Sequence, residues 1–233
     1  TFEVLIQLGA VFAVVQEFFF RIWPFGRRKK ARGIYLKEDR VILIGKILLA
    51  CLPAAVLGLL LDDFLDKYLY NGFVVSLMLI VYGVFFLLIE DKNAKRDFQY
   101  TKVEDLSWSL CFKIGLFQCL ALIPGTSRSG ATIIGAMLLS VGRVAATEFS
   151  FFLSVPVMAG ASLLKLLKHG GHFTGTEWFM LLLSMVLAYL VSIYCIRFLL
   201  RYIRNHDFKA FGYYRIVFGS ITLLWFLVSH FVL

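Results

Sequence analysis

The sequence predicts an all-α polytopic membrane protein with six transmembrane helices and one re-entrant helical hairpin. Of its 233 residues, 60% are hydrophobic, and the mean hydropathy is +0.82, well above the range of soluble domains. Several apolar runs approach the roughly 20 residues that a helix needs to cross about 30 Å of hydrocarbon. One further apolar segment is interrupted by proline, glycine and serine, which is typical of a helix broken inside a membrane protein.

The six expected spans follow the apolar runs in chain order. They are Phe2–Phe20, Val41–Leu61, Phe73–Ile89, Val144–Leu167, Trp178–Leu200 and Gly212–Val232. Because these runs are continuous rather than alternating, they disfavour a transmembrane β-barrel. Pro53 in the second span and Pro156 in the fourth each remove one helical hydrogen bond, so we expect bends there.

Basic residues gather in every second loop between the spans, which is the positive-inside pattern of cytoplasmic loops. These loops contain Arg21, Arg27, Arg28, Lys29, Lys30, Arg32, Lys37 and Arg40, then Lys92, Lys95, Arg96 and Lys102, and last Arg201, Arg204, Lys209 and Arg215. The pattern predicts that both ends of the 233 residues lie outside. It also explains the net charge of +9 without a nucleic-acid partner, since no basic soluble domain is present.

The segment Leu106–Val141 lies between the third and fourth spans and is interrupted at its centre by PGTSRSG, residues 124–130. Both of its ends must lie on the cytoplasmic side for the charge alternation to hold. We therefore expect two half-helices that enter the membrane and return. Pro124 ends the first half-helix, and Gly125 permits an unusual backbone turn. The second half-helix is expected to start near Gly130 with Ser129 as its cap.

This interruption has the chemistry of an anion site. The free N–H groups and the positive dipole end of the second half-helix attract anions. Arg128 is costly at membrane depth without a partner, and its planar fork matches two phosphate oxygens. The hydroxyls of Ser127, Ser129 and Thr132 add hydrogen-bond donors. A different interpretation stays open: a tightly packed glycine- and serine-rich break in which Arg128 pairs with Glu148 or Glu3.

Other chemistries are disfavoured by the same residues. The G-x-x-x-x-G spacing of the interruption lacks the Lys-Ser/Thr ending and the preceding strand of a nucleotide-binding loop, so we exclude nucleotide hydrolysis. The four cysteines form no C-x-x-C pair, and neither a disulfide framework nor a zinc site is expected. No residue is assigned as a metal ligand.

A weak internal repeat is present. Glu3 and Glu148 each stand at the head of an apolar helix, and three spans separate them, so the second copy is inverted relative to the first. The chain is therefore expected to form a single integral membrane domain over residues 1–233, with a first repeat at about 1–90 and a second at about 106–233. The first copy should have its own re-entrant hairpin, which predicts roughly 40 further residues before residue 1.

The residues FQCLALIPGTSRSGAT, 117–132, closely resemble the second signature of the bacterial undecaprenyl-pyrophosphate phosphatases, the bacitracin-resistance family. Residues 2–10, FEVLIQLGA, and 148–153, EFSFFL, are similar to stretches that flank the family signatures. The resemblance covers the whole chain. The family's first signature, a glutamate-rich stretch with a serine and a histidine, has no match in residues 1–233, so we expect part of the active site to be missing from this chain.

The resemblance implies a hydrolase of the bacterial inner membrane that converts undecaprenyl pyrophosphate to undecaprenyl phosphate, the lipid carrier of peptidoglycan synthesis. It implies that Arg128, Ser127 and Ser129 act in catalysis. Substrate-binding positions would be Gly125, Thr126, Gly130, Thr132, Glu148, Glu3 and Gln7. It also implies a divalent cation, Mg²⁺ or Ca²⁺, as cofactor. The partners would be the polyprenyl pyrophosphate and the bilayer, and a homodimer is an open option for the assembly.

Two other functions come from the residues alone. A transporter or flippase for an anionic lipid or small anion would use the same broken helices and inverted repeats. Phosphate release separates it from a phosphatase. A channel with a re-entrant filter is disfavoured, because cation filters use carbonyls or acidic rings and Arg128 stands at the tip of this hairpin.

Overall fold

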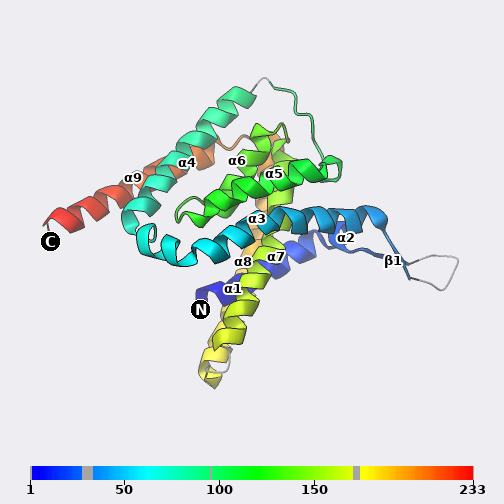
Figure 1. Ribbon diagram of the computed structural model, residues 1–233, viewed down its shortest axis with the longest axis horizontal. Coiled ribbons are helices and arrows are strands. Elements are labelled where there is room, and N and C mark those ends of the chain that lie inside the picture. The colour runs from blue at the N-terminus through cyan, green and yellow to red at the C-terminus, as the bar shows by residue number, and fades with distance from the viewer. Residues whose placement is uncertain (1, 28–33, 95, 170–173, 233) are drawn as a thin grey trace. The chain divides into compact units, whose positions relative to one another are not determined.

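The computed structural model describes residues 2–27, 34–94, 96–169 and 174–232, and it is almost entirely helical in that part (Figure 1). The first half contains α1 Phe2–Glu17, α2 Phe19–Ile22, β1 Phe25–Arg27, β2 Ile34–Leu36, α3 Glu38–Tyr68 and α4 Gly72–Asn93. The second half contains η1 Val103–Asp105, α5 Trp108–Gln118, η2 Cys119–Leu122, α6 Arg128–Leu138, α7 Arg143–His169, α8 Gly175–Asn205 and α9 Lys209–Val232.

The predicted all-α polytopic class is confirmed. Among the described residues, α3, α4, α7, α8 and α9 are long and apolar enough to cross a membrane, and they match the second to sixth expected spans. The first expected span, Phe2–Phe20, is α1 followed by α2, and its apolar stretch Val4–Glu17 is shorter than the others. The chain is a multi-pass membrane protein. Both α3 and α7 continue through their internal prolines, Pro53 and Pro156.

A small β-hairpin lies in the first basic loop, where the sequence predicts only a loop. Strands β1 and β2 pair antiparallel, with Phe25 opposite Leu36 and Arg27 opposite Ile34. The loop has no apolar alternation long enough to predict strands, and each strand has only three residues. Residues 28–33, which carry four of the basic side chains of this loop, lie outside the described residues.

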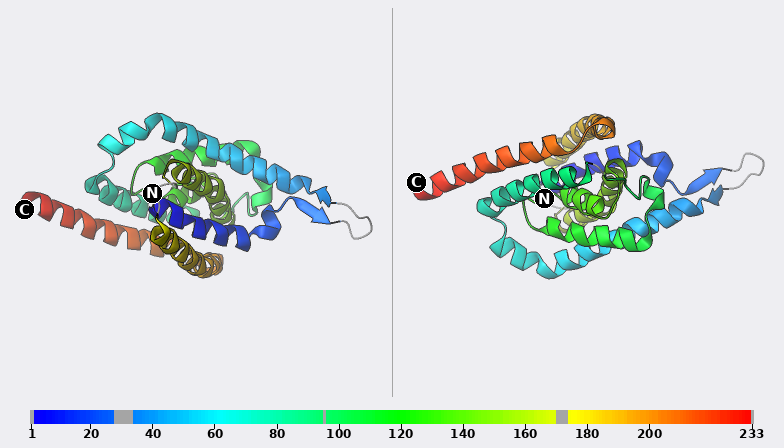
Figure 2. Two further views of the ribbon diagram at one scale, coloured as in Figure 1. Left: turned by 90° about the horizontal axis from the view of Figure 1, so that it is seen from below. Right: turned by 90° about the horizontal axis from the view of Figure 1, so that it is seen from above.

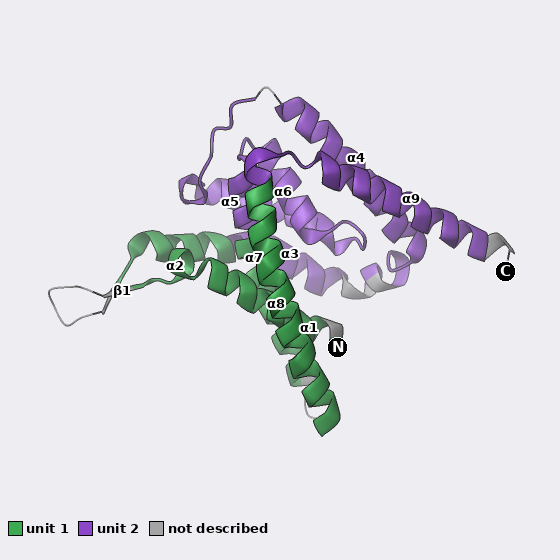
Figure 3. Ribbon diagram, turned by 180° about the vertical axis from the view of Figure 1, so that it is seen from behind, with its two compact units in different colours: residues 1–48, 151–202 green, residues 49–150, 203–233 purple. Residues whose placement is uncertain are grey.

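The chain forms two compact units (Figure 3). Unit 1 comprises residues 1–48 and 151–202. Within it, α1 packs closely on α8, since a Cβ on Gly9 would lie 2.2 Å from the Met185 carbonyl oxygen. The Ser162 hydroxyl on α7 donates to the Val4 carbonyl of α1 at 2.8 Å. Small side chains allow such close helix contacts in membrane proteins.

Unit 2 comprises residues 49–150 and 203–233 and contains the interrupted segment. Helices α4 and α9 run side by side along much of their length (Figure 2). Their backbones touch at a glycine pair, where a Cβ on Gly83 would lie 2.8 Å from the Gly212 carbonyl oxygen. Helix α5 packs on α6 and also on the backbone of α3, because a Cβ on Gly115 would lie 2.2 Å from the Ala50 oxygen.

Candidate functional site

The interrupted segment is a hairpin of two short helices, as the sequence predicts. Helix α5 ends at Gln118, α6 begins at Arg128, and their antiparallel packing places Gly135 against the ring of Phe117. The two ends of the hairpin are joined, since the Tyr100 amide donates to the Ser140 oxygen at 3.2 Å and the Gly142 amide to the Tyr100 oxygen at 2.8 Å. The start and the finish of the interrupted segment therefore lie side by side.

The backbone between the two helices, residues 123–127, is here called the break. Gly125 has φ +86°, and a Cβ at this position would also lie 2.4 Å from the Val75 carbonyl oxygen on α4. Glycine is therefore required both for its dihedral angle and for close approach to α4. Ser127 has φ +67° without being glycine. Such a backbone costs about 1–3 kcal/mol and is concentrated at functional sites.

Helix α6 starts two residues earlier than expected, which changes the assignment of its cap. Ser127, not Ser129, is the N-cap, and its Oγ accepts a hydrogen bond from the Gly130 amide at 3.3 Å. The Oγ atoms of Ser127 and Ser129 lie 3.5 Å apart. The sequence alone did not separate the two serines because both suit the capping position. Arg128 is the first residue of α6 and is half-buried rather than extended into bulk water.

Thr132 lies one turn into α6, and its hydroxyl is already engaged. The Thr132 Oγ1 atom donates to helix carbonyls and lies 2.7 Å from the Ser150 Oγ on α7. Both side chains are buried. The hydroxyl pair joins α6 to the part of α7 that carries the half-buried Glu148. In this arrangement, the Thr132 hydroxyl holds two helices together, whereas the sequence predicts a free donor.

Arg215 contacts the break, although the charge pattern of the sequence places it with a cytoplasmic loop. It lies on α9, and its Nη2 donates to the carbonyl oxygens of Gly125 at 2.7 Å and Thr126 at 3.2 Å. No local signal in the sequence connects Arg215 with a loop about ninety residues earlier. Two further polar side chains near the break, Gln118 and Thr126, are buried, and their polar atoms have no hydrogen-bond partner in the described part of the chain.

The remaining candidate positions are Gly130 in α6 and Glu3 and Gln7 in α1. Gly130 lies in the first turn of α6, and a Cβ there would meet Ser127 and Phe86 only at ordinary contact distance. Glu3 and Gln7 are both on α1 in unit 1. The Gln7 side chain is exposed, and the Glu3 side chain lies outside what the structure describes. The roles of Glu3 and Gln7 remain predictions.

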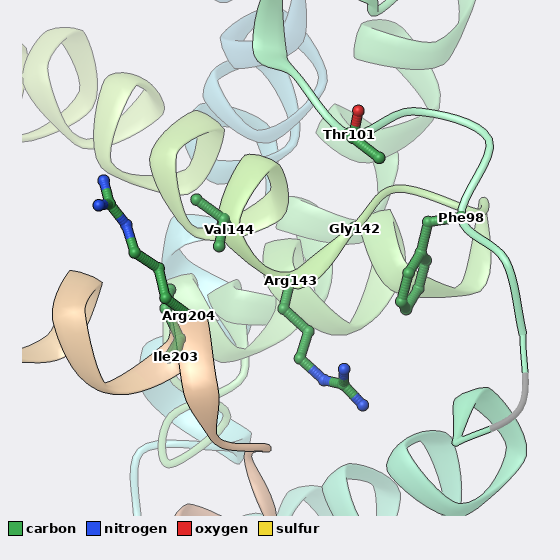
Figure 4. A pocket seen from close by; sticks show the side chains of 7 residues that line it. All are labelled: Phe98, Thr101, Gly142, Arg143, Val144, Ile203 and Arg204. Carbon is green, nitrogen blue, oxygen red and sulfur yellow. The ribbon is translucent and has the colours of Figure 1, made fainter.

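A separate pocket of about 210 Å³ lies at the start of α7 (Figure 4). Its lining residues are Phe98, Thr101, Gly142, Arg143, Val144, Ile203 and Arg204. The Arg143 guanidinium is bound by the buried Glu90 carboxylate, and the two guanidinium groups point away from each other in Figure 4. The pocket therefore does not offer the paired cationic fork that a diphosphate group needs.

The described residues do not by themselves build a metal centre. No group of three or more His, Cys, Asp or Glu side chains lies close enough to hold a metal ion anywhere in the described ranges. The polar side chains that contact one another or the break are the hydroxyls of Ser127 and Ser129 and the guanidinium group of Arg215. These donors suit a phosphate group better than they suit a resident cation.

Comparisons with known proteins match almost the whole chain. The profile of the family described as bacitracin resistance protein BacA matches residues 1–221. An undecaprenyl-diphosphatase of Enterococcus faecalis is 51% identical over 223 residues, which cover 96% of this chain and 80% of the relative. One of Acetivibrio thermocellus is 49% identical over 226 residues, covering 97% and 82%. One of Streptococcus mutans is 49% identical over 231 residues, covering 98% and 81%.

Proposed function

The chain belongs to the bacitracin resistance protein BacA family, and from that premise we propose that it is a membrane phosphatase that converts undecaprenyl diphosphate to undecaprenyl phosphate. Water cleaves the terminal phosphoanhydride bond, and inorganic phosphate leaves. The lipid monophosphate then serves again as the carrier for peptidoglycan synthesis. The relatives that carry the name undecaprenyl-diphosphatase span nearly the whole chain, which supports this activity.

The observation that carries the proposal within the structure is the start of α6. A strained Ser127, the first-turn N–H groups and Arg128 come together where a helix begins inside a hairpin of a multi-pass membrane protein. Phosphoryl transfer needs charge stabilisation on the phosphoryl oxygens more than it needs covalent chemistry from the protein. A helix N-terminus with a guanidinium fork and hydroxyl donors supplies that stabilisation.

We assign roles to the site residues on this basis. Arg128 binds two oxygens of the diphosphate, and the hydroxyls of Ser127 and Ser129 donate to its remaining oxygens. Gly130 allows the backbone to approach the phosphate groups closely, and Gly125 supports substrate binding by permitting the turn against α4 that leads into α6. Thr126 and Thr132 complete the wall of the site. Glu148, Glu3 and Gln7 are assigned to substrate binding by family resemblance, and no residue of this chain is assigned as the nucleophile.

The inverted repeat is part of the proposal, with α1, α3 and α4 corresponding to α7, α8 and α9. Helix lengths support two of the three pairs, since α3 and α8 both have 31 residues and α4 and α9 have 22 and 24, whereas α1 and α7 have 16 and 27. The small residues at the contact between α4 and α9 also support the inverted repeat. Ser76 precedes Gly83 by seven positions, and Gly212 precedes Gly219 by seven. Gly83 faces Gly212, and Gly219 faces the Ser76 oxygen, as a two-fold relation requires.

We also propose that the enzyme resides in the bacterial inner membrane and depends on a divalent cation, Mg²⁺ or Ca²⁺. The cation would share the negative charge of the diphosphate. Because the described residues hold no cluster of metal ligands, we assign it no protein ligand. A chelator should abolish turnover, and added Mg²⁺ or Ca²⁺ should restore it. Turnover that persists in excess chelator would remove the cation from the proposal.

The homodimer is a separate question. Light scattering of the solubilised protein tests it, since a dimer has twice the protein mass of a single chain.

The test of the function is phosphate release from undecaprenyl diphosphate by the protein purified in detergent. We expect the wild-type protein to turn over and Arg128→Ala to lose at least about 100-fold in kcat, the loss typical when a charge-stabilising donor is removed. Arg201→Ala, at an exposed position on α8, is the matched control and should keep full activity. Lipid movement across vesicles without phosphate release would favour the transporter alternative instead.

A further inference from the structure

We propose that Arg215 is a positioning residue for the phosphate site, an inference that rests on the proposed function. Arg215 lies outside the signature that identifies the site, on the last helix of the chain. Its Nη2 donates to two successive carbonyls of the break, Gly125 at 2.7 Å and Thr126 at 3.2 Å. These two peptide groups lead directly into Ser127, the cap of α6.

The break needs such an external partner. Its carbonyls lie between η2 and α6, where regular helical bonding is interrupted. Ser127 has positive φ, a conformation that a residue other than glycine keeps only when the surroundings enforce it. A hydrogen bond from a charged donor is roughly twice as strong as one between neutral groups. Arg215 therefore restrains the backbone conformation of the break, where regular helical hydrogen bonds are absent.

Arg215 is itself fixed in place. Its guanidinium carbon lies 5.9 Å from the ring centroid of Tyr82, a buried residue of α4. The α4 and α9 backbones meet at Gly83 and Gly212, where neither glycine leaves room for a Cβ. The Tyr82 contact places the guanidinium against the closely packed α4–α9 pair, and its hydrogen bonds connect the break to the same pair.

The orientation of the break carbonyls matters for an anionic substrate. Carbonyl oxygens carry partial negative charge and would repel a diphosphate if they faced it. Their bonds to Arg215 hold them on the α9 side, which leaves the hydroxyls and first-turn N–H groups of residues 127–129 to face the ligand. Such preorganised donors act on the charge that develops in the transition state. Loss of Arg215 should therefore lower kcat more than it raises KM.

The experiment compares Arg215→Gln and Arg215→Lys with Arg201→Gln as the matched control, using phosphate release from undecaprenyl diphosphate. We expect Arg215→Gln to lose at least about tenfold in kcat with KM changed less than about threefold. Arg215→Lys keeps a charged donor and should recover most of the loss. Amide hydrogen exchange over residues 125–130 should accelerate in Arg215→Gln, while exchange in α8 stays unchanged.

The outcomes separate this inference from the function. If the wild-type protein releases phosphate and Arg215→Gln keeps kcat within twofold, the inference is wrong and the function stands. Equal losses in Arg215→Gln and Arg215→Lys, with unchanged exchange at the break, would also overturn it. If Arg215→Gln does not fold, Tyr82→Leu replaces it, because that change removes the ring beside the guanidinium. A Tyr82→Leu protein with wild-type kcat and wild-type exchange at the break would overturn the inference.

Discussion

Glu90 and Arg143 form an ion pair, buried on the carboxylate side, that joins α4 to the first residue of α7. The Arg143 Nε lies 2.9 Å from each Glu90 carboxylate oxygen, and Nη2 makes a further contact. The Phe208 amide also donates to Glu90 Oε1 at 3.0 Å. One carboxylate therefore connects α4, α7 and the segment that precedes α9, beside the point where the two ends of the broken hairpin meet.

Glu90→Gln should destabilise the protein strongly. The Glu90 side chain is fully buried, whereas that of Arg143 is 26% exposed. The substitution leaves the partly buried guanidinium without its counter-charge and weakens its hydrogen bonds, which should cost about 1.5–3 kcal/mol. We expect a clear fall in the temperature of thermal unfolding in detergent. Asp91→Asn is the control, since its ion pair with Lys209 is exposed and should contribute nothing measurable. Equal unfolding temperatures for the two variants would contradict the prediction.

Gly125→Ala should abolish activity. Alanine at φ +86° is strained, and its Cβ would lie 2.4 Å from the Val75 oxygen, so the break must move away from α4. We expect phosphate release to fall at least about 100-fold, because small displacements of reacting groups have effects of that size. Gly160→Ala on α7 is the control: a Cβ there meets nothing within 4 Å, and activity should be unchanged. An active Gly125→Ala protein would show that the break conformation is not needed.

Ser127→Ala and Ser127→Gly separate the hydroxyl of Ser127 from its backbone strain. Both remove the cap hydroxyl that the Gly130 amide binds. Only glycine relieves the strain at φ +67°, so the free energy of unfolding of Ser127→Gly should exceed that of Ser127→Ala by about 1 kcal/mol, and its unfolding temperature should be higher. If the hydroxyl binds substrate, both variants should lose activity to the same degree. Full activity in the glycine variant would limit Ser127 to a structural role.

Thr132 and Ser150 should be coupled in stability. Their hydroxyl oxygens are 2.7 Å apart in a buried contact, so Thr132→Val leaves the Ser150 hydroxyl without this partner. Each single substitution is expected to cost about 1 kcal/mol, and the Thr132→Val, Ser150→Ala double variant should cost less than the sum. Chemical unfolding of the four proteins gives the coupling energy. Strict additivity would mean that the hydroxyl pair contributes nothing to the contact between α6 and α7.

Much of the site could be predicted from the sequence because its signals are local. Hydropathy depends on composition along the chain, so the five long helices could be located without a structure. Proline restricts the local backbone and glycine frees it, so Pro124 and Gly125 predict a break in the helix, and the structure has it between α5 and α6. Arg128, at the start of α6, is recognisable from the sequence because a charged side chain in an apolar stretch is costly and indicates a functional site.

The tertiary structure decided what those local signals left open. Ser127 rather than Ser129 caps α6, because the choice depends on where the chain leaves the break. The Thr132 hydroxyl meets Ser150, and the guanidinium of Arg215 meets the break across 90 positions of sequence. These contacts depend on how closely helices approach, which glycines such as Gly83 and Gly212 set pairwise. Residue type and periodicity specify which face of a helix is apolar, but only packing selects its partner.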